Sequence, residues 1–130
     1  KLMWPVKRGL VVGRFGVQKH AKERRVRIAN NGIDLLVSKY EKVLASGDGI
    51  VKAVLQVPGS NTSLIVDHGG FYSVYSNIRE VKLKIGDKVK TGDYLPLISI
   101  DSEGLNKLHF ELWKGTTKVN PEYFLQVELN

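Results

Sequence analysis

The sequence predicts an all-β domain, a sandwich or barrel of short antiparallel strands. Segments rich in Val, Ile and Leu recur about every ten residues, and Gly, Asn, Asp and Pro separate them. Helical periodicity is almost absent. The chain has 130 residues and no linker or internal repeat. We therefore expect one domain, residues 1–130, which can bury a core without disulfides.

The apolar segments place the strands in order along the chain. They are expected at residues 9–12, 26–28, 32–37, 42–45, 49–55, 63–66, 72–75, 94–100 and 107–113. A short strand centred on Val89 lies between two Gly-Asp turns, at 86–87 and 92–93. Short helical turns are expected at 76–81 and at 121–125. The second opens with Asn120 as a cap and Pro121 at the first helical position.

Composition limits the classes of partner. Twenty Lys and Arg against thirteen Asp and Glu give a formal charge of +7, which attracts anionic partners. Nucleic acid is not expected, because the densest basic run, 19–27, has no aromatic residues between its charges. The absence of cysteine excludes disulfides and thiolate metal sites.

Membrane insertion is not expected either. No segment approaches the roughly twenty apolar residues of a membrane span, and no signal segment opens the chain. The abrupt start at Lys1 leads us to expect the C-terminal part of a longer exported protein whose targeting segment lies outside this sequence.

From Trp4 to Leu125 a series of motifs in register resembles the LytM-type, lysostaphin-like zinc metallopeptidase domain. The motifs are Gly13-Arg14-Phe15-Gly16, Gly32-Ile33-Asp34, Asp48-Gly49-Ile50-Val51, Val66-Asp67-His68-Gly69, Tyr75-Ser76-Asn77, Gly86-Asp87-x-Val89-x-x-Gly92, Leu108-His109-Phe110-Glu111 and Asn120-Pro121-x-x-Phe124-Leu125. The resemblance implies an antiparallel β-sheet sandwich with a surface groove. Biotinyl and lipoyl carriers share the Gly-Asp turns, but the corresponding hairpin here, 98–104, contains no Lys to carry a cofactor.

The catalytic positions depart from the pattern of active members. By this resemblance the zinc ligands would be Asn30, Asp34 and His109, and the assisting histidines would be Lys107 and Asn77. A protein zinc site needs about three good ligands and a water. An Asn amide is a poor ligand, and a Lys is protonated near neutral pH. Asp34 and His109 are therefore remnant ligand positions, zinc is not expected, and the domain is predicted to be a pseudoenzyme.

These departures resemble the EnvC-like and NlpD-like murein hydrolase activators. That resemblance implies a noncatalytic domain that activates a periplasmic N-acetylmuramoyl-L-alanine amidase, and so promotes septal peptidoglycan splitting and daughter-cell separation. It also implies a location in the cell envelope and a coiled coil N-terminal to this domain. Two alternatives stay open. One is a residual zinc metalloendopeptidase that acts on peptidoglycan crosslinks and recruits His20 or His68. The other is a passive peptidoglycan-binding module.

Strand alternation predicts the face that a partner would contact. Lys107, His109, Glu111 and Trp113 should share one face of a strand, while the residues between them enter the core. His20 and His68 are expected to make structural hydrogen bonds. The predicted groove and partner-binding residues are Asn30, Asn31, Asp34, Tyr75, Asn77, Lys107, His109, Glu111 and Trp113.

Overall fold

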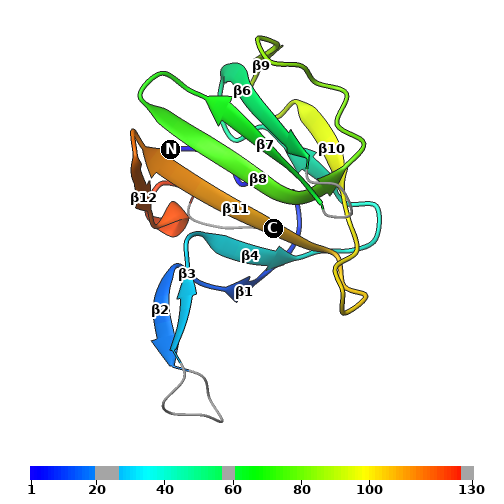
Figure 1. Ribbon diagram of the computed structural model, residues 1–130, viewed down its shortest axis with the longest axis vertical. Coiled ribbons are helices and arrows are strands. Elements are labelled where there is room, and N and C mark those ends of the chain that lie inside the picture. The colour runs from blue at the N-terminus through cyan, green and yellow to red at the C-terminus, as the bar shows by residue number, and fades with distance from the viewer. Residues whose placement is uncertain (20–26, 57–60, 127–130) are drawn as a thin grey trace.

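A ten-stranded antiparallel sheet dominates the computed structural model, which describes residues 1–19, 27–56 and 61–126 (Figure 1). The main path of the sheet runs β1-β4-β11-β8-β7-β6-β9, with β10 against β8 and β5, and β12 against β11. The all-β prediction is confirmed. The strand bounds are β1 Leu10–Gly13, β4 Ile33–Leu36, β5 Lys42–Leu44, β6 Gly49–Gln56, β7 Thr62–Asp67, β8 Phe71–Arg79, β9 Lys88–Val89, β10 Tyr94–Ile98, β11 Lys107–Lys114 and β12 Thr117–Val119.

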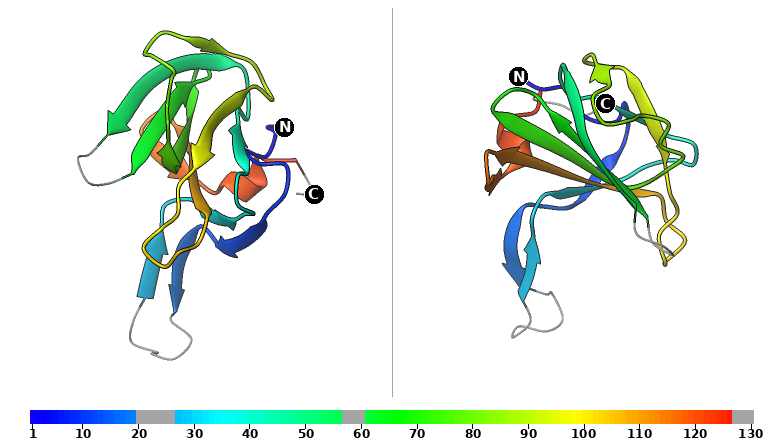
Figure 2. Two further views of the ribbon diagram at one scale, coloured as in Figure 1. Left: turned by 90° about the vertical axis from the view of Figure 1, so that its right-hand side faces the viewer. Right: turned by 45° about the horizontal axis from the view of Figure 1, so that its top comes forward.

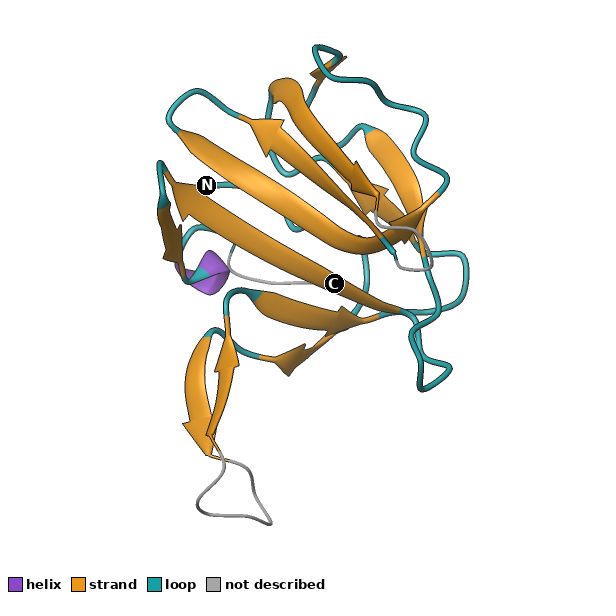
Figure 3. Cartoon of the chain, in the orientation of Figure 1, coloured by secondary structure: helices purple, strands orange, loops and turns teal. Residues whose placement is uncertain are grey.

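Two smaller elements complete the described chain. Strands β2, Gly16–Lys19, and β3, Arg27–Asn30, pair in a hairpin that projects from the body of the domain (Figure 2). The expected C-terminal helical turn is a single 3-10 turn, η1, at Pro121–Tyr123 (Figure 3). Its cap forms as predicted, since Asn120 Oδ1 accepts a hydrogen bond from the Glu122 backbone N–H at 3.0 Å. Among the described residues, no helix is long and apolar enough to cross a membrane.

The core lies on one face of the sheet. In β11 the side chains alternate as predicted: Leu108, Phe110 and Leu112 are at most 2% exposed, and the residues between them are partly exposed. The N-terminal segment, the β5–β10 pair and the C-terminal turn supply the other layer of the core, through Trp4, Val6, Val43, Ala45, Leu95, Ile98 and Leu125. Within the described ranges no element covers the opposite face of the sheet, and its side chains on β4, β7, β8 and β11 are partly exposed.

The helical turn predicted at 76–81 is wrong, because β8 continues to Arg79. Ser76 pairs with both β7 and β11, and Ile78 pairs with β7 and β10. Asn77, between them, has no partner in β7 and takes a φ of 67°, so it is the extra residue of a β-bulge. Asn tolerates this left-handed conformation better than most residues. The polar Ser-Asn pair therefore marks a bulge in a strand and not a helix.

Two strands of the structure, β2 and β12, are not predicted by the sequence pattern, and one short predicted strand is confirmed. Strands β2 and β12 lie in segments with little apolar alternation. They form because each pairs with a neighbouring strand, β2 with β3 and β12 with β11. The short strand centred on Val89 is confirmed as β9, which pairs with the start of β6.

His68 belongs to a chain of polar contacts that enters the core. Its Nδ1 lies 2.7 Å from the Asp48 carbonyl oxygen, and its Nε2 lies 2.6 Å from Ser73 Oγ. Ser73 Oγ in turn lies 2.8 Å from the Tyr75 hydroxyl, which accepts the Ser46 backbone N–H at 3.1 Å. The expectation that His68 makes structural hydrogen bonds is confirmed, and the ring has no free nitrogen to offer a metal.

Burial gives His68 an acid-sensitive role in stability. It lowers the pKa of His68 below the ordinary value of 6.5, so the fold favours the neutral ring. The unfolded chain then binds the proton more tightly. The contribution of His68 to the free energy of unfolding should be constant above pH 6.5. It should fall below that pH, by no more than about 1.4 kcal/mol per pH unit.

Urea unfolding of the wild type and a His68→Asn variant between pH 7.5 and pH 5 checks this prediction. Carboxylates remote from His68 affect both proteins equally, so the difference between the two curves reports His68 and its interactions with Asp48 and Asp67. The difference should shrink as the pH falls. Parallel curves would contradict the prediction.

Candidate functional site

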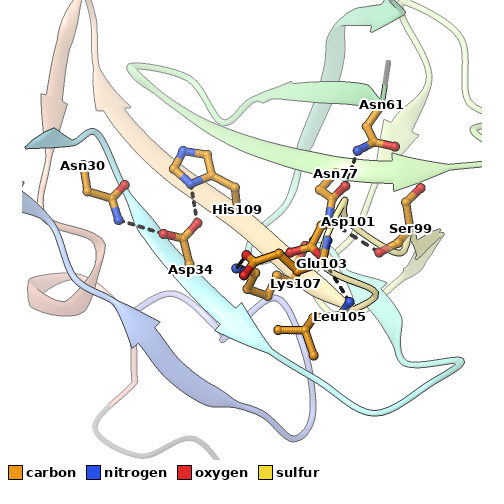
Figure 4. A network of polar contacts seen from close by, with 10 residues as sticks. All are labelled: Asn30, Asp34, Asn61, Asn77, Ser99, Asp101, Glu103, Leu105, Lys107 and His109. Atoms are coloured by element: carbon orange, nitrogen blue, oxygen red, sulfur yellow. Dashed lines mark hydrogen bonds and ion pairs between the residues drawn. The ribbon is translucent and has the colours of Figure 1, made fainter. Parts of the chain in front are cut away.

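Five side chains form one continuous polar chain across β3, β4 and β11. Asn30 Nδ2 donates to Asp34 Oδ2 at 2.9 Å, and His109 Nδ1 lies 2.9 Å from Asp34 Oδ1 (Figure 4). On the other side of the ring, His109 Nε2 lies 2.7 Å from Glu111 Oε2. Trp113 Nε1 donates to Glu111 Oε1 at 2.7 Å. His109 is thus held between two carboxylates, each of which accepts a further hydrogen bond on its second oxygen.

The backbone around this chain explains the arrangement. Asp34 and His109 are direct partners in the β4–β11 ladder, so their side chains meet on the same face of the sheet. Gly13 and Gly32 allow the backbone to lie close to Asp34 and to strand β11. A Cβ on Gly13 would collide with Asp34 Oδ2, and one on Gly32 would collide with the Phe110 carbonyl oxygen. At Gly32 the obstacle is backbone, so only glycine fits, whereas a side chain at Gly13 would displace the Asp34 carboxylate from its hydrogen bonds.

The two carboxylates make His109 a cation. Burial alone would lower the pKa of His109, but its hydrogen bonds and charge interactions with Asp34 and Glu111 raise it to about 9. Burial would likewise raise the pKa of each carboxyl group, yet the interactions with His109 lower both values. At neutral pH the centre of the site is therefore an imidazolium between two carboxylates, and both ring nitrogens donate.

These residues do not fit a zinc site. In the described part of the chain, no group of three or more His, Cys, Asp or Glu side chains is arranged to hold a metal ion. Asn30, at the position predicted for the remaining ligand, directs its amide N–H₂ at Asp34, while its Oδ1 accepts the Gly32 backbone N–H at 3.1 Å. A protonated His109 cannot donate a lone pair to a metal. His20, a potential substitute ligand, lies outside the described residues.

Lys107 is not placed as a general base. Its Nζ lies 3.2 Å from Asp101 Oδ2 and 3.5 Å from Glu103 Oε1, and Figure 4 shows the side chain directed toward these acids. The hydrogen bond with Asp101 raises the pKa of Lys107, so the amine stays protonated. A base must be deprotonated to accept a proton from water.

Three further predicted groove residues have other surroundings. Asn77 directs its amide at backbone carbonyls, those of Lys107 and Ser99. The Tyr75 side chain is 0% exposed and packs on Phe110, so its assignment to the groove surface is corrected. The strand alternation of β8 buries it. Asn31 is exposed and accepts a hydrogen bond from Lys118 Nζ at 2.6 Å, at the rim of the site.

The Asn77 contacts predict a measurable structural role. Asn77→Ala removes the amide hydrogen bonds and places an alanine at a φ of 67°. We expect it to lower the free energy of unfolding by about 2–4 kcal/mol. Asn77→Gly removes the same hydrogen bonds but tolerates the backbone, so it should cost about 1–2 kcal/mol. Chemical denaturation of both variants checks the order. Equal losses would show that the bulge conformation contributes nothing.

The polar chain lies at one end of an open face of the sheet. We define the open face by the partly exposed side chains that point away from the core on four strands: Asp34, His109, Glu111, Trp113, Tyr72, Val74, Ser76, Ser63 and Ile65. Register confirms the rows, since His109 pairs with Ser76 and Glu111 pairs with Val74. A hollow of about 330 Å³ lies on this face, and Ile65, Tyr72, Val74, Glu111 and Trp113 are among the residues that line it.

Part of this face carries no functional signal in the sequence. The pattern around Val74, Tyr72 and Ile65 predicts strands but no site, and the sequence does not indicate that Glu111 binds His109. Strand alternation through the full length of β8 would have placed Val74 and Ser76 beside His109 and Glu111. The bond between His109 and Glu111 depends on side-chain rotamers, which alternation does not determine.

Comparison with known proteins assigns this chain to a family. Residues 28–121, which include the whole polar chain, match the model of peptidase family M23. The chain belongs to peptidase family M23. The resemblance to the LytM-type domain is therefore confirmed, and the all-β fold agrees with it.

Proteins similar to this M23 domain include a murein hydrolase activator, a chain of a pore forming complex and a zinc containing peptidase. It is 27% identical over 124 residues to the murein hydrolase activator NlpD of Escherichia coli, covering 94% of this chain and 30% of that protein. A chain of the SpoIIQ–SpoIIIAH pore forming complex superposes with a TM-score of 0.79 at 25% identity, covering 97% and 91% of the two chains. A zinc containing peptidase from Vibrio cholerae superposes at 0.75 with 27% identity, covering 90% and 37%. This chain spans less than a third of the NlpD sequence.

Proposed function

We propose that this M23 domain binds an N-acetylmuramoyl-L-alanine amidase of the cell envelope and raises its activity, without cleaving peptides itself. The observation that carries the proposal is the state of His109. Both of its ring nitrogens are bound by carboxylates, and the third ligand position holds an amide that donates to Asp34. The remaining groups stabilise one another, so they offer a surface and not a reaction centre.

Two comparisons support a role through binding. NlpD of Escherichia coli is a murein hydrolase activator, and its similarity extends over 94% of this chain. SpoIIQ forms a complex with another protein, SpoIIIAH, and its fold matches nearly the whole of this domain. A noncatalytic domain with an accessible sheet face fits a function in which contact with a partner replaces chemistry. Activation would promote septal peptidoglycan splitting during cell separation.

The open face supplies the contact surface. Val74, Ile65 and Tyr72 give it an apolar floor, and the Trp113 indole lies at the edge of the same hollow. Partly exposed apolar and aromatic side chains around a hollow are typical of interface anchors. The polar chain at one end adds fixed charges, which would set the orientation of a bound segment.

The release of dye from labelled sacculi by the organism's own amidases, with and without the purified domain, tests the proposal. The wild-type domain should stimulate release by an amidase and release nothing alone. Val74→Asp should lose most of the stimulation, because it places a charge in the hollow. Ile85→Asp is the matched control, since Ile85 is 72% exposed in the loop before β9. The control should behave as wild type.

Three results would contradict the proposal. If the Val74→Asp variant still stimulated the amidase, the open face would not be the contact surface. Crosslink cleavage by the domain alone, sensitive to a chelator, would establish the second candidate, a residual zinc peptidase. Binding to sacculi without any effect on an amidase would identify a passive peptidoglycan-binding module.

A further inference from the structure

A second surface, with no residue in common with the hollow of the open face, gathers cations around an exposed tyrosine. Tyr94, the first residue of β10, is 59% exposed. Lys7 Nζ donates to the Tyr94 hydroxyl at 3.3 Å and lies 5.5 Å from the ring centroid. Lys42 Nζ, from β5, lies 4.7 Å from the same centroid. One aromatic ring thus holds two ammonium groups, which interact favourably with its π-electrons but repel each other.

A hollow of about 300 Å³ adjoins this ring. Its floor is apolar and includes Leu83, Pro96 and Leu97, and its rim carries Lys42, Lys82, Glu80 and Tyr94. That volume is at the small end of the range for ligand pockets, about 300–1,000 Å³. The hollow therefore suits a single ring-sized group with an anionic substituent at its rim.

The cations of this surface are only partly compensated. Within the described residues, neither Lys42 nor Lys82 forms an ion pair with a carboxylate. Glu80 lies on the rim, and Glu41 Oε2 accepts the Lys7 backbone N–H at 3.2 Å. Three ammonium groups thus share this surface with two carboxylates, and two of the ammonium groups lie against one ring. An anion there would relieve their mutual repulsion.

We propose that this surface binds a carboxylated polysaccharide. A sugar ring has an apolar C–H face that fits against Pro96 and Leu97, while its hydroxyl groups stay in water. The carboxylate then lies at Lys7 and Lys42 and forms charge-assisted hydrogen bonds. A nucleobase fits less well, because stacking needs a free aromatic face and ammonium groups already lie over the Tyr94 ring.

Fluorescence anisotropy with labelled oligogalacturonate, a chain of carboxylated sugars, tests this site on the intact domain. The wild type should bind the probe, and unlabelled dextran, an uncharged polysaccharide, should not compete. The Lys7→Gln/Lys42→Gln double variant should bind at least tenfold more weakly, and Tyr94→Ala should show a similar loss. Lys88→Gln/Lys90→Gln removes the same charge beside a different hollow, so it should change binding less than twofold.

Circular dichroism of each variant confirms that the fold is intact, since all of the replaced side chains are exposed. An equal loss in both double variants would overturn the proposal, because net charge alone would then explain binding. Competition by polyphosphate as strong as that by unlabelled oligogalacturonate would also overturn it, because the sugar ring would then be dispensable. The proposal would also be overturned if the wild type did not bind labelled oligogalacturonate at low salt.

Discussion

Replacing Asn30 with His should give this M23 domain a zinc site. We expect the Asn30→His variant to bind one equivalent of zinc, on the order of a hundredfold more tightly than the wild type, because it restores a third nitrogen or oxygen ligand. The Asn30 amide already lies 2.9 Å from Asp34 Oδ2, so a side chain at this position faces the remnant ligands. Zinc must displace the proton on His109, so binding should release protons and tighten as the pH rises.

Isothermal titration calorimetry in two buffers of different ionisation enthalpy measures both the affinity and the proton release. Asn31→His is the matched control, since Asn31 is exposed at the rim and contacts Lys118. It should bind zinc no better than the wild type. Tight binding of one equivalent by the wild type would contradict both this prediction and the proposed loss of catalysis.

Alkaline pH should destabilise the domain through His109. The pKa of His109 in the fold is about 9, against an ordinary value of 6.5. The folded state therefore binds the proton more tightly than the unfolded chain. The contribution of His109 to the free energy of unfolding is fully present below pH 6.5 and is lost as the pH rises through 9. The difference between the two pKa values, about 9 against 6.5, sets an upper limit of about 3–4 kcal/mol on this contribution.

NMR titration of the His109 ring in chelator-treated protein gives the pKa directly, and urea unfolding between pH 6 and pH 10 gives the energy. Glu111→Gln removes one carboxylate but keeps a hydrogen-bond acceptor, so the pKa of His109 should fall and the alkaline loss should shrink. The pKa of His68 is shifted in the opposite direction, so its ring signal is an internal reference for the NMR titration of His109. A His109 pKa near 6.5 would show that the carboxylates do not hold the ring as a cation.

Much of the fold follows from the sequence because strand alternation and turn residues report local structure. The 107–113 segment shows this best, since every second residue is buried as predicted. The error at 76–81 has a tertiary cause. Ser76 and Asn77 are common in turns, but ladders on both sides and the carbonyls that Asn77 binds keep this segment in the sheet.

The candidate site was only partly predictable for a related reason. Asp34 and His109 could be placed together from their motifs, and register confirms that they pair. Alternation indicated which β11 residues share a face, but not that Glu111 would bind His109. Tyr75 was misplaced because a motif position does not specify the face of the strand. Its burial depends on packing against Phe110.

Gly13 and Gly32 have a consequence for how such domains diverge. Both lie where any side chain would collide with Asp34 or with the β11 backbone, so a mutation at either would alter the walls of the site. Asn30 and Lys107 are partly exposed and lie outside the core, so we expect replacements there to disturb the packing less. Catalysis can then disappear through a few substitutions at the rim, while the shape of the site is inherited. In a search for M23 domains that share the shape of this site, Gly13 and Gly32 should therefore be retained more often than Asn30 and Lys107.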